Sequence, residues 1–155
     1  MSRYQPADVQ TVQDGDPRQE GKAAMPRRIL IVEDQRVLAK NMKAYLSRGA
    51  SDVRIAADIA QALEILESFS PDALVVDFGL PGADGLRTYA EIIRHQARKI
   101  DCVMITGSPT EQLAQDARDI GIHHIFCKPF RFAELPRLLE ALAKASANDA
   151  TASNE

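Results

Sequence analysis

The sequence predicts a doubly wound α/β fold around a five-stranded parallel sheet, and three observations support this prediction. Five short apolar runs alternate along the chain with five amphipathic segments. Three of the runs are apolar throughout, as in strands that helices cover on both faces. The second and fifth runs carry polar residues, which indicates the two edges of the sheet. Strands that alternate with helices are joined by right-handed crossovers, so the strands run parallel.

The expected elements follow one another in strict alternation. We expect strands at residues 29–32, 53–56, 73–76, 102–105 and 124–127, and helices at 35–47, 58–68, 84–96, 110–120 and 132–144. Asp58 is a suitable N-cap, Gly121 a suitable C-cap, and Pro136 belongs in the first turn of the last helix. Five such β–α units favour a flavodoxin-like (βα)5 fold with strand order 2-1-3-4-5.

Length, charge and cysteine content limit the classes of protein to consider. The 155 residues suit one domain, and the net charge of −3 argues against nucleic-acid binding through bulk charge. No apolar run approaches the ~20 residues that cross a bilayer. Two cysteines and no secretory signal favour a reducing compartment. We therefore expect a soluble cytoplasmic protein without direct contact to nucleic acid or membrane.

The polar ends of the chain differ in composition from its middle. We expect residues 1–26 to form a flexible arm, 27–145 the folded domain and 146–155 a disordered tail. Cys102 and Cys127 are expected to be core thiols, too far apart for a disulfide.

Polar side chains follow four of the five expected strands. They are Glu33 with Asp34, Asp77, Thr106 with Gly107, and Lys128 with Pro129. Parallel strands bring their carboxyl ends to one edge of the sheet, so we expect these residues to meet there. Three carboxylates in one crevice repel one another and need a cation. Oxygen ligands favour Mg²⁺ or Mn²⁺ over zinc.

The other members of this group suit a phosphoryl group. Lys128 supplies a compact positive charge, Thr106 a hydroxyl, and Gly107 leaves room for a tetrahedral group. Asp77, in the centre, can act as the nucleophile and carry an acyl phosphate. Together these residues predict a receptor for phosphoryl transfer.

The same residues stand in motifs that closely resemble the receiver domain of bacterial two-component response regulators, the CheY-like superfamily. The motifs are residues 29–34 (ILIVED), Asp77 with Leu80-Pro81-Gly82 and Asp84-Gly85 after it, Thr106-Gly107, and Lys128-Pro129-Phe130. The resemblance covers residues 27–145.

The resemblance implies a metal site and its ligands. Asp77 would be the phosphoacceptor and would also ligate Mg²⁺. Asp34 would ligate the ion directly and Glu33 through water. The backbone carbonyl of Gly79 would complete the protein ligands.

The resemblance also implies how the phosphoryl group is held. Lys128 would bind it, Thr106 would move toward it, and the bond between Lys128 and Pro129 would be cis. The chain departs from the family at Ile125, which occupies the position of the usual switch aromatic. Phe126 should point to the other side of the strand. Gly79 lacks a side chain beside the phosphoryl group, and Leu80 replaces a common Met.

The function implied by the resemblance is a phosphorylation-dependent signalling switch. The phosphoryl donor would be a sensor histidine kinase or a histidine phosphotransfer protein. A downstream protein would bind the face formed by helix 4, strand 5 and helix 5, about residues 109–144. A homodimer through the same face is a second possibility. We expect no enzymatic activity beyond Mg²⁺-dependent self-phosphorylation and slow self-dephosphorylation.

Two other functions use the same residue types. A phosphatase of the haloacid-dehalogenase type needs a second Asp two residues after its nucleophile, where this chain has Gly79, and usually a cap domain. A degenerate receiver would only bind partners. Because we find no output domain after residue 145, we expect a stand-alone receiver or a piece of a longer regulator or hybrid kinase.

Overall fold

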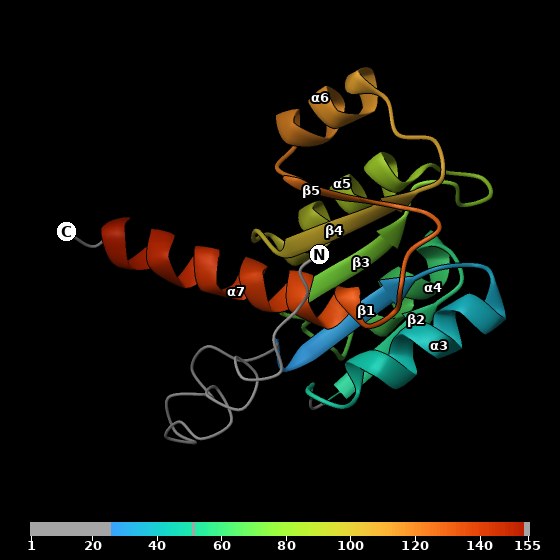
Figure 1. The fold of residues 1–155 in the computed structure, drawn as a ribbon, viewed down its shortest axis with the longest axis horizontal. Coiled ribbons are helices and arrows are strands. Elements are labelled where there is room, and N and C mark those ends of the chain that lie inside the picture. Colours follow the sequence, from blue (N-terminus) through green and yellow to red (C-terminus); the bar gives the residue numbers. More distant parts are fainter. Residues whose placement is uncertain (1–25, 51, 154–155) are drawn as a thin grey trace, which may run out of the picture.

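Helices cover both faces of a five-stranded parallel sheet in the computed structural model, which describes residues 26–50 and 52–153 (Figure 1). The strands are β1 (Arg28–Val32), β2 (Asp52–Ala56), β3 (Ala73–Asp77), β4 (Asp101–Thr106) and β5 (His124–Cys127). The helices are α3 (Arg36–Leu46), α4 (Ile59–Ile65), α5 (Gly85–Gln96), α6 (Glu111–Asp119) and α7 (Glu134–Ser153). The order β2-β1-β3-β4-β5 confirms the predicted fold. Apart from Pro26, the predicted N-terminal arm lies outside the described residues.

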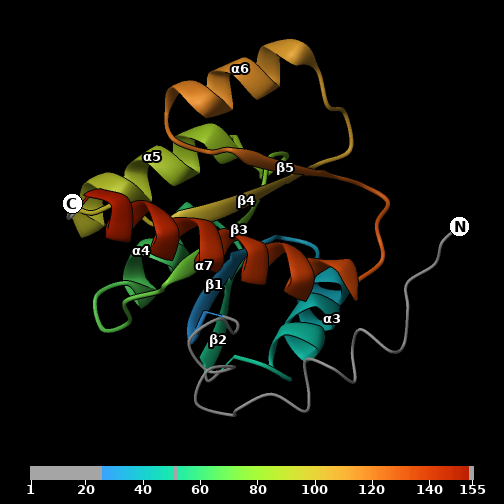
Figure 2. The ribbon, with the colours of Figure 1, turned by 60° about the vertical axis from the view of Figure 1, so that its left-hand side comes forward.

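Alternation along the strands divides the core into two layers. Leu30 and Val32 of β1 pack with residues of α4, α5 and α6 on one face of the sheet. Ile29 and Ile31 pack with residues of α3 and α7 on the other. Figures 1 and 2 show α3 and α7 side by side, and they are in contact. Because β1 is central and covered on both faces, it is apolar from Ile29 to Val32.

Side-chain caps fix where three of the helices begin. The caps are Asp58, Asp84 and Thr110, and each accepts a hydrogen bond of 2.9–3.0 Å from the backbone N–H three residues on. Each cap satisfies a donor that has no partner within the helix. The sequence predicts helix starts at these three residues, and each helix begins at the residue that follows its cap.

Helix ends agree less closely with the prediction. Gly121 follows the C-cap Ile120 with φ of +103°, where glycine is favoured. Pro136 lies in the first turn of α7, as predicted. The predicted end at Lys144 and the predicted tail from residue 146 are wrong as far as Ser153, because α7 continues to that residue. Alanine, the strongest helix former, is frequent in 145–152 and extends the helix.

The two cysteines differ in their surroundings. Both are free; Cys102 is buried in β4, whereas Cys127 is exposed at the end of β5. The prediction of a core thiol is therefore wrong for Cys127, because β5 is an edge strand whose last residue only β4 flanks. Among the described residues, no helix has the length and apolarity to cross a membrane.

Candidate functional site

Three carboxylates meet at the carboxyl ends of β1 and β3. The register pairs Val32 with Val76, so Glu33 and Asp34 leave β1 beside Asp77, the last residue of β3. Carboxylate oxygens of these three acids all lie within 4.8 Å of one another. Adjacent parallel strands thus bring together acids that are more than forty residues apart in sequence.

Glu33 is the buried member of the cluster. Its residue surface is 1% exposed, Oε2 accepts the backbone N–H of Gln35 at 3.1 Å, and Oε1 accepts no hydrogen bond. Burial raises the pKa of Glu33 to about 7, and the negative charges of Asp77 and Asp34 add to this effect. The Gln35 N–H and the charge of Lys128 oppose it. A buried carboxylate oxygen without a hydrogen-bond donor is costly, and a cation would relieve that cost.

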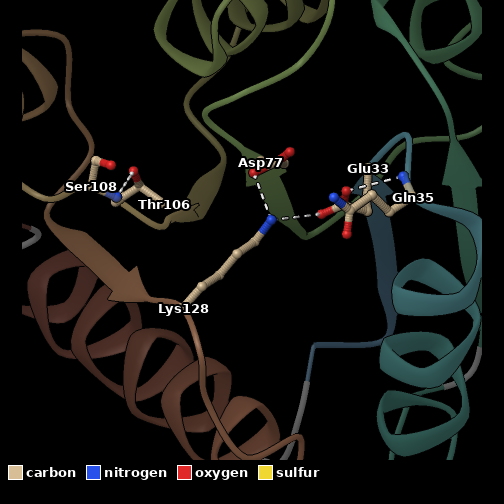
Figure 3. Close-up of polar contacts among 6 residues, drawn as sticks. All are labelled: Glu33, Gln35, Asp77, Thr106, Ser108 and Lys128. Carbon is tan, nitrogen blue, oxygen red and sulfur yellow. Dashed lines mark hydrogen bonds and ion pairs between the residues drawn. The ribbon is translucent and has the colours of Figure 1, made fainter.

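Lys128 reaches the cluster from the opposite side. Its Nζ lies 3.3 Å from Asp77 Oδ1 and 3.8 Å from Glu33 Oε1 (Figure 3). Lys128 N–H donates to the carbonyl of Thr106 at 2.8 Å, which holds the end of β5 against β4. The bond between Lys128 and Pro129 is cis, as predicted. One ammonium group therefore contacts two of the three acids, Glu33 and Asp77.

The donor set fits a hard divalent cation. All three side chains offer oxygen, the ligand atom that Mg²⁺ and Mn²⁺ prefer. The single charge of Lys128 balances only one of the three carboxylates, and Glu33 Oε1 is left without a hydrogen bond. The predicted ligands Glu33, Asp34 and Asp77 thus lie where such an ion would bind.

Thr106 lies beside this cluster without entering it. The residue is 3% exposed, and its Oγ1 accepts the backbone N–H of Ser108 at 3.1 Å. Figure 3 shows this hydroxyl toward Ser108 and apart from Asp77 and Lys128. A Cβ added at Gly107 would meet no atom within 4 Å, so the space next to the site is open.

Two glycines border Asp77. A Cβ added at Gly79 would lie 4.0 Å from Asp77 Oδ2, which makes residue 79 a neighbour of that carboxylate. A Cβ at Gly85 would lie 2.8 Å from Phe78 Cα and 3.0 Å from the Asp77 carbonyl oxygen. Sequence reasoning noted Asp84-Gly85 only as part of a motif. The close approach explains why glycine begins α5 beneath the site.

Ile125 and Phe126 face opposite sides of β5. Ile125 packs against the layer that contains Met104, whereas Phe126 packs in the layer of α3 and α7. The Phe126 ring lies 4.7 Å, centroid to centroid, from that of Phe130. As predicted, Phe126 points to the other side of the strand from Ile125, so its ring does not occupy the position of the switch aromatic.

Comparison with known proteins identifies the class to which this fold belongs. The model of the response regulator receiver domain matches residues 29–140. A CheY-like receiver domain from Methanospirillum hungatei has a similar structure, with TM-score 0.72 and 21% identity over 79% of this chain and 98% of that chain. The HemR receiver domain from Leptospira biflexa has TM-score 0.67 at 25% identity over 75% of this chain and 93% of that chain.

Curated relatives agree. The transcriptional regulatory protein PdtaR of Mycobacterium tuberculosis is 31% identical over 125 residues, 80% of this chain and 60% of that protein. Response regulator MprA of Mycolicibacterium vanbaalenii is 30% identical over 125 residues, 81% of this chain and 54% of that protein. The chain thus spans little more than half the length of these relatives.

The chain belongs to the response regulator receiver family. Domains of this family serve signalling and are not classical enzymes. The phosphatase alternative therefore loses its support, and Gly79 stands where that chemistry needs an acid.

Proposed function

We propose that the chain is a phosphorylation-dependent switch in which Asp77 accepts a phosphoryl group. The observation that carries this proposal is the convergence of Glu33, Asp34 and Asp77 within 4.8 Å, with Lys128 Nζ 3.3 Å from Asp77. Of the two acids that Lys128 contacts, Asp77 is the nearer, at 3.3 Å against 3.8 Å for Glu33. An Asp77 oxygen attacks phosphorus, the bond from phosphorus to the donor nitrogen breaks, and its electron pair returns to the donor imidazole.

Glu33, Asp34, Asp77 and the backbone carbonyl of Gly79 would hold a Mg²⁺ ion, for which Mn²⁺ could substitute. When bound, the ion supplies positive charge for the carboxylates and for the phosphoryl oxygens. Glu33 must ionise to take part, and its raised pKa opposes this step in the metal-free protein. The orphaned Oε1 atom supports this assignment.

Lys128 and Thr106 would hold the transferred group. Lys128 balances part of the ≈ −1.5 to −2 charge that a phosphoryl group adds. The Thr106 hydroxyl would exchange its bond with Ser108 N–H for one to a phosphoryl oxygen. Phosphorylation would favour the conformer in which this exchange has occurred, which is a population shift.

The altered surface would be that of α6, β5 and α7, about residues 109–144, through which a downstream protein or a second copy would bind. Ile125 lies on this path in place of an aromatic side chain. The donor would be a sensor histidine kinase or a histidine phosphotransfer protein. We propose residues 27–145 as the receiver unit and a cytoplasmic location.

Labelling with acetyl phosphate tests this function. Wild-type protein should be labelled with Mg²⁺ and unlabelled with EDTA, and Asp77→Asn should lose labelling. Asp116→Asn on the exposed face of α6 is the matched control and should keep it. Beryllofluoride with Mg²⁺ should shift amide signals in the NMR spectrum of the wild-type protein. An NMR spectrum that beryllofluoride leaves unchanged, together with no labelling, would favour the degenerate receiver.

A further inference from the structure

A cavity opens at the amino ends of β4 and β5, at the opposite end of the sheet from Asp77. Its volume is about 550 Å³, a typical size for a pocket that binds a small molecule. The pairing of β5 with β4 begins at Val103, so Asp101 and Cys102 extend past β5 and leave room beside β4. Residues of α5 and α7 form other parts of the wall. We call this space the amino-end cavity.

The two acids on the cavity wall already have partners. Asp72 accepts the backbone N–H groups of Arg27 and Arg28 at 3.2 and 3.0 Å. Asp101 accepts the Ser146 hydroxyl at 2.6 Å, where α7 passes the amino end of β4 (Figure 2). These hydrogen bonds occupy both carboxylates, but their negative charges still disfavour a doubly charged anion in the cavity.

Two donor groups on the wall are poorly used. Within residues 26–50 and 52–153, Lys99 forms no ion pair or hydrogen bond. The Tyr89 hydroxyl reaches only the Ile100 carbonyl, at 3.4 Å, which is longer than the ~2.5–3.0 Å usual for such a bond. Tyr89 is 2% exposed, and burial raises its pKa to about 12, so the hydroxyl keeps its proton at neutral pH.

Gly121 brings these two donor groups together. A Cβ added at Gly121 would lie 3.5 Å from the Tyr89 hydroxyl oxygen and 3.7 Å from Lys99 Cε, so both side chains stand over the same glycine. His123 and His124 also line the cavity, and a neutral imidazole offers one N–H donor. A carboxylate has two oxygens that accept hydrogen bonds, one for the ammonium and one for the hydroxyl.

The remainder of the wall is largely apolar. Ile100 and Leu142 are buried side chains that line the cavity. Cys102 is a free, buried thiol, and burial raises its pKa, so it stays neutral. Covering these side chains with an apolar body is favourable.

We propose that the amino-end cavity binds a small organic monocarboxylate. Lys99 and the Tyr89 hydroxyl bind the carboxylate over Gly121, and an apolar body the size of a single ring packs against Cys102 and Leu142. An amine of the same size fits less well, because Lys99 repels it and both acids already have partners. The site lies apart from the carboxylate cluster, so binding needs neither Mg²⁺ nor phosphorylation.

Three probes of similar size and different charge, benzoate, benzamide and benzylamine, test this inference. Each is titrated into the full chain in EDTA, and the amide signals in the NMR spectrum are followed. Benzoate should bind at least about tenfold more tightly than the other two, because its hydrogen bonds are charge-assisted. The largest shifts should be at Lys99, Cys102 and Gly121, with none at Asp77.

Matched variants separate the possible outcomes. Lys99→Met should weaken benzoate binding by about tenfold and leave benzamide binding unchanged. Lys144→Met removes the same charge from an exposed position of α7 outside the cavity wall and should bind benzoate as the wild type does. Ala145→Trp, at an exposed position of the wall, should block benzoate. A thermal melt of each variant shows whether it is folded.

Three results would overturn the inference. They are equal affinity of the wild type for benzoate and benzamide, an equal loss of benzoate binding in Lys99→Met and Lys144→Met, and no shift at the cavity with benzoate at millimolar concentration. None of these measurements depends on the phosphorylation of Asp77, so the proposed function is tested separately.

Discussion

The acidic residues at the two ends of the sheet differ in the number of partners that are available to them. At the amino end each acid has its own donor: Asp72 accepts two backbone N–H groups at 3.0 and 3.2 Å, Asp52 binds Arg54, and Asp101 accepts the Ser146 hydroxyl at 2.6 Å. At the carboxyl end, Glu33 and Asp77 share Lys128, and Asp34 lies in the same cluster. The partnered acids stabilise the fold, whereas the buried charge of Glu33 and its crowding with Asp34 and Asp77 cost free energy that a bound cation would offset.

This contrast assigns different consequences to similar substitutions. Removing an acid at the amino end leaves donors without an acceptor and costs stability. Removing an acid at the carboxyl end relieves repulsion and costs ligand affinity instead. Four predictions test this contrast, in decreasing order of the change that we expect.

The largest effect is expected on metal affinity. Glu33→Gln combined with Asp34→Asn should weaken Mg²⁺ binding by about 10- to 100-fold or more, because two of the three acids lose their charge. Isothermal titration calorimetry measures this change. Asp101→Asn, at the amino end, should bind Mg²⁺ as the wild type does. Equal affinity in the double variant and the wild type would remove the carboxyl end from the metal site.

The second effect concerns the metal-free protein and depends on pH. The pKa of Glu33 is raised from 4.5 to about 7, so its neutral form stabilises the fold below about pH 4.5 and this contribution is lost as pH rises through 7. Glu33→Gln should therefore raise the free energy of unfolding by about 1–3 kcal/mol at pH 8, and by less at pH 5. Urea unfolding in EDTA measures both.

Exposed Glu64→Gln in α4 is the matched control and should change stability little at either pH. A metal-free Glu33→Gln protein that is less stable than the wild type at pH 8 would contradict the cost of burying the Glu33 charge beside Asp77.

The third effect has the opposite sign. Asp72→Ala should lower the free energy of unfolding by about 1–2 kcal/mol, because the N–H groups of Arg27 and Arg28 lose their acceptor at the start of β1. Urea unfolding measures the loss, and Mg²⁺ affinity should not change. If Asp72→Ala weakened Mg²⁺ binding as much as the carboxyl-end variant, the two ends would not be independent.

The smallest effect tests the extension of α7. Ser146→Ala removes the hydrogen bond to Asp101 and should cost about 0.5–1 kcal/mol. Hydrogen exchange of the last turns of α7 should become faster, with no change near Asp77. Unchanged exchange in α7 would mean that this bond does not hold the helix against β4.

Much of the fold could be predicted because the local hydrophobic pattern and the capping residues agree with where the strands and helices lie. Strands covered on both faces had to be apolar, as Ile29 to Val32 are, and caps such as Asp58 had to precede helices. The convergence of Glu33, Asp34 and Asp77 followed from the parallel topology alone, since all three lie at strand ends. The sequence therefore predicts which acids lie together at this site.

What could not be predicted depends on close contacts and on competing propensities. Adjacent acids in a sequence do not reveal that Glu33 is the one buried with an orphaned oxygen. Nothing local indicated that a Cβ at Gly85 would strike Phe78 and Asp77. Polar composition suggested a tail from residue 146, but alanine-rich sequence continues the helix to Ser153. Cys127 is exposed because it ends an edge strand, a position that the residue type alone does not reveal.

The most direct test of the central claim is to locate the phosphoryl group on the wild-type chain. After incubation with acetyl phosphate and Mg²⁺, borohydride reduces an acyl phosphate, and peptide mass spectrometry then identifies the reduced residue. We expect reduction at Asp77 and at no other acid, and none when EDTA is present. A label that resists alkali, is lost in acid and maps to His95, His123 or His124 would contradict it.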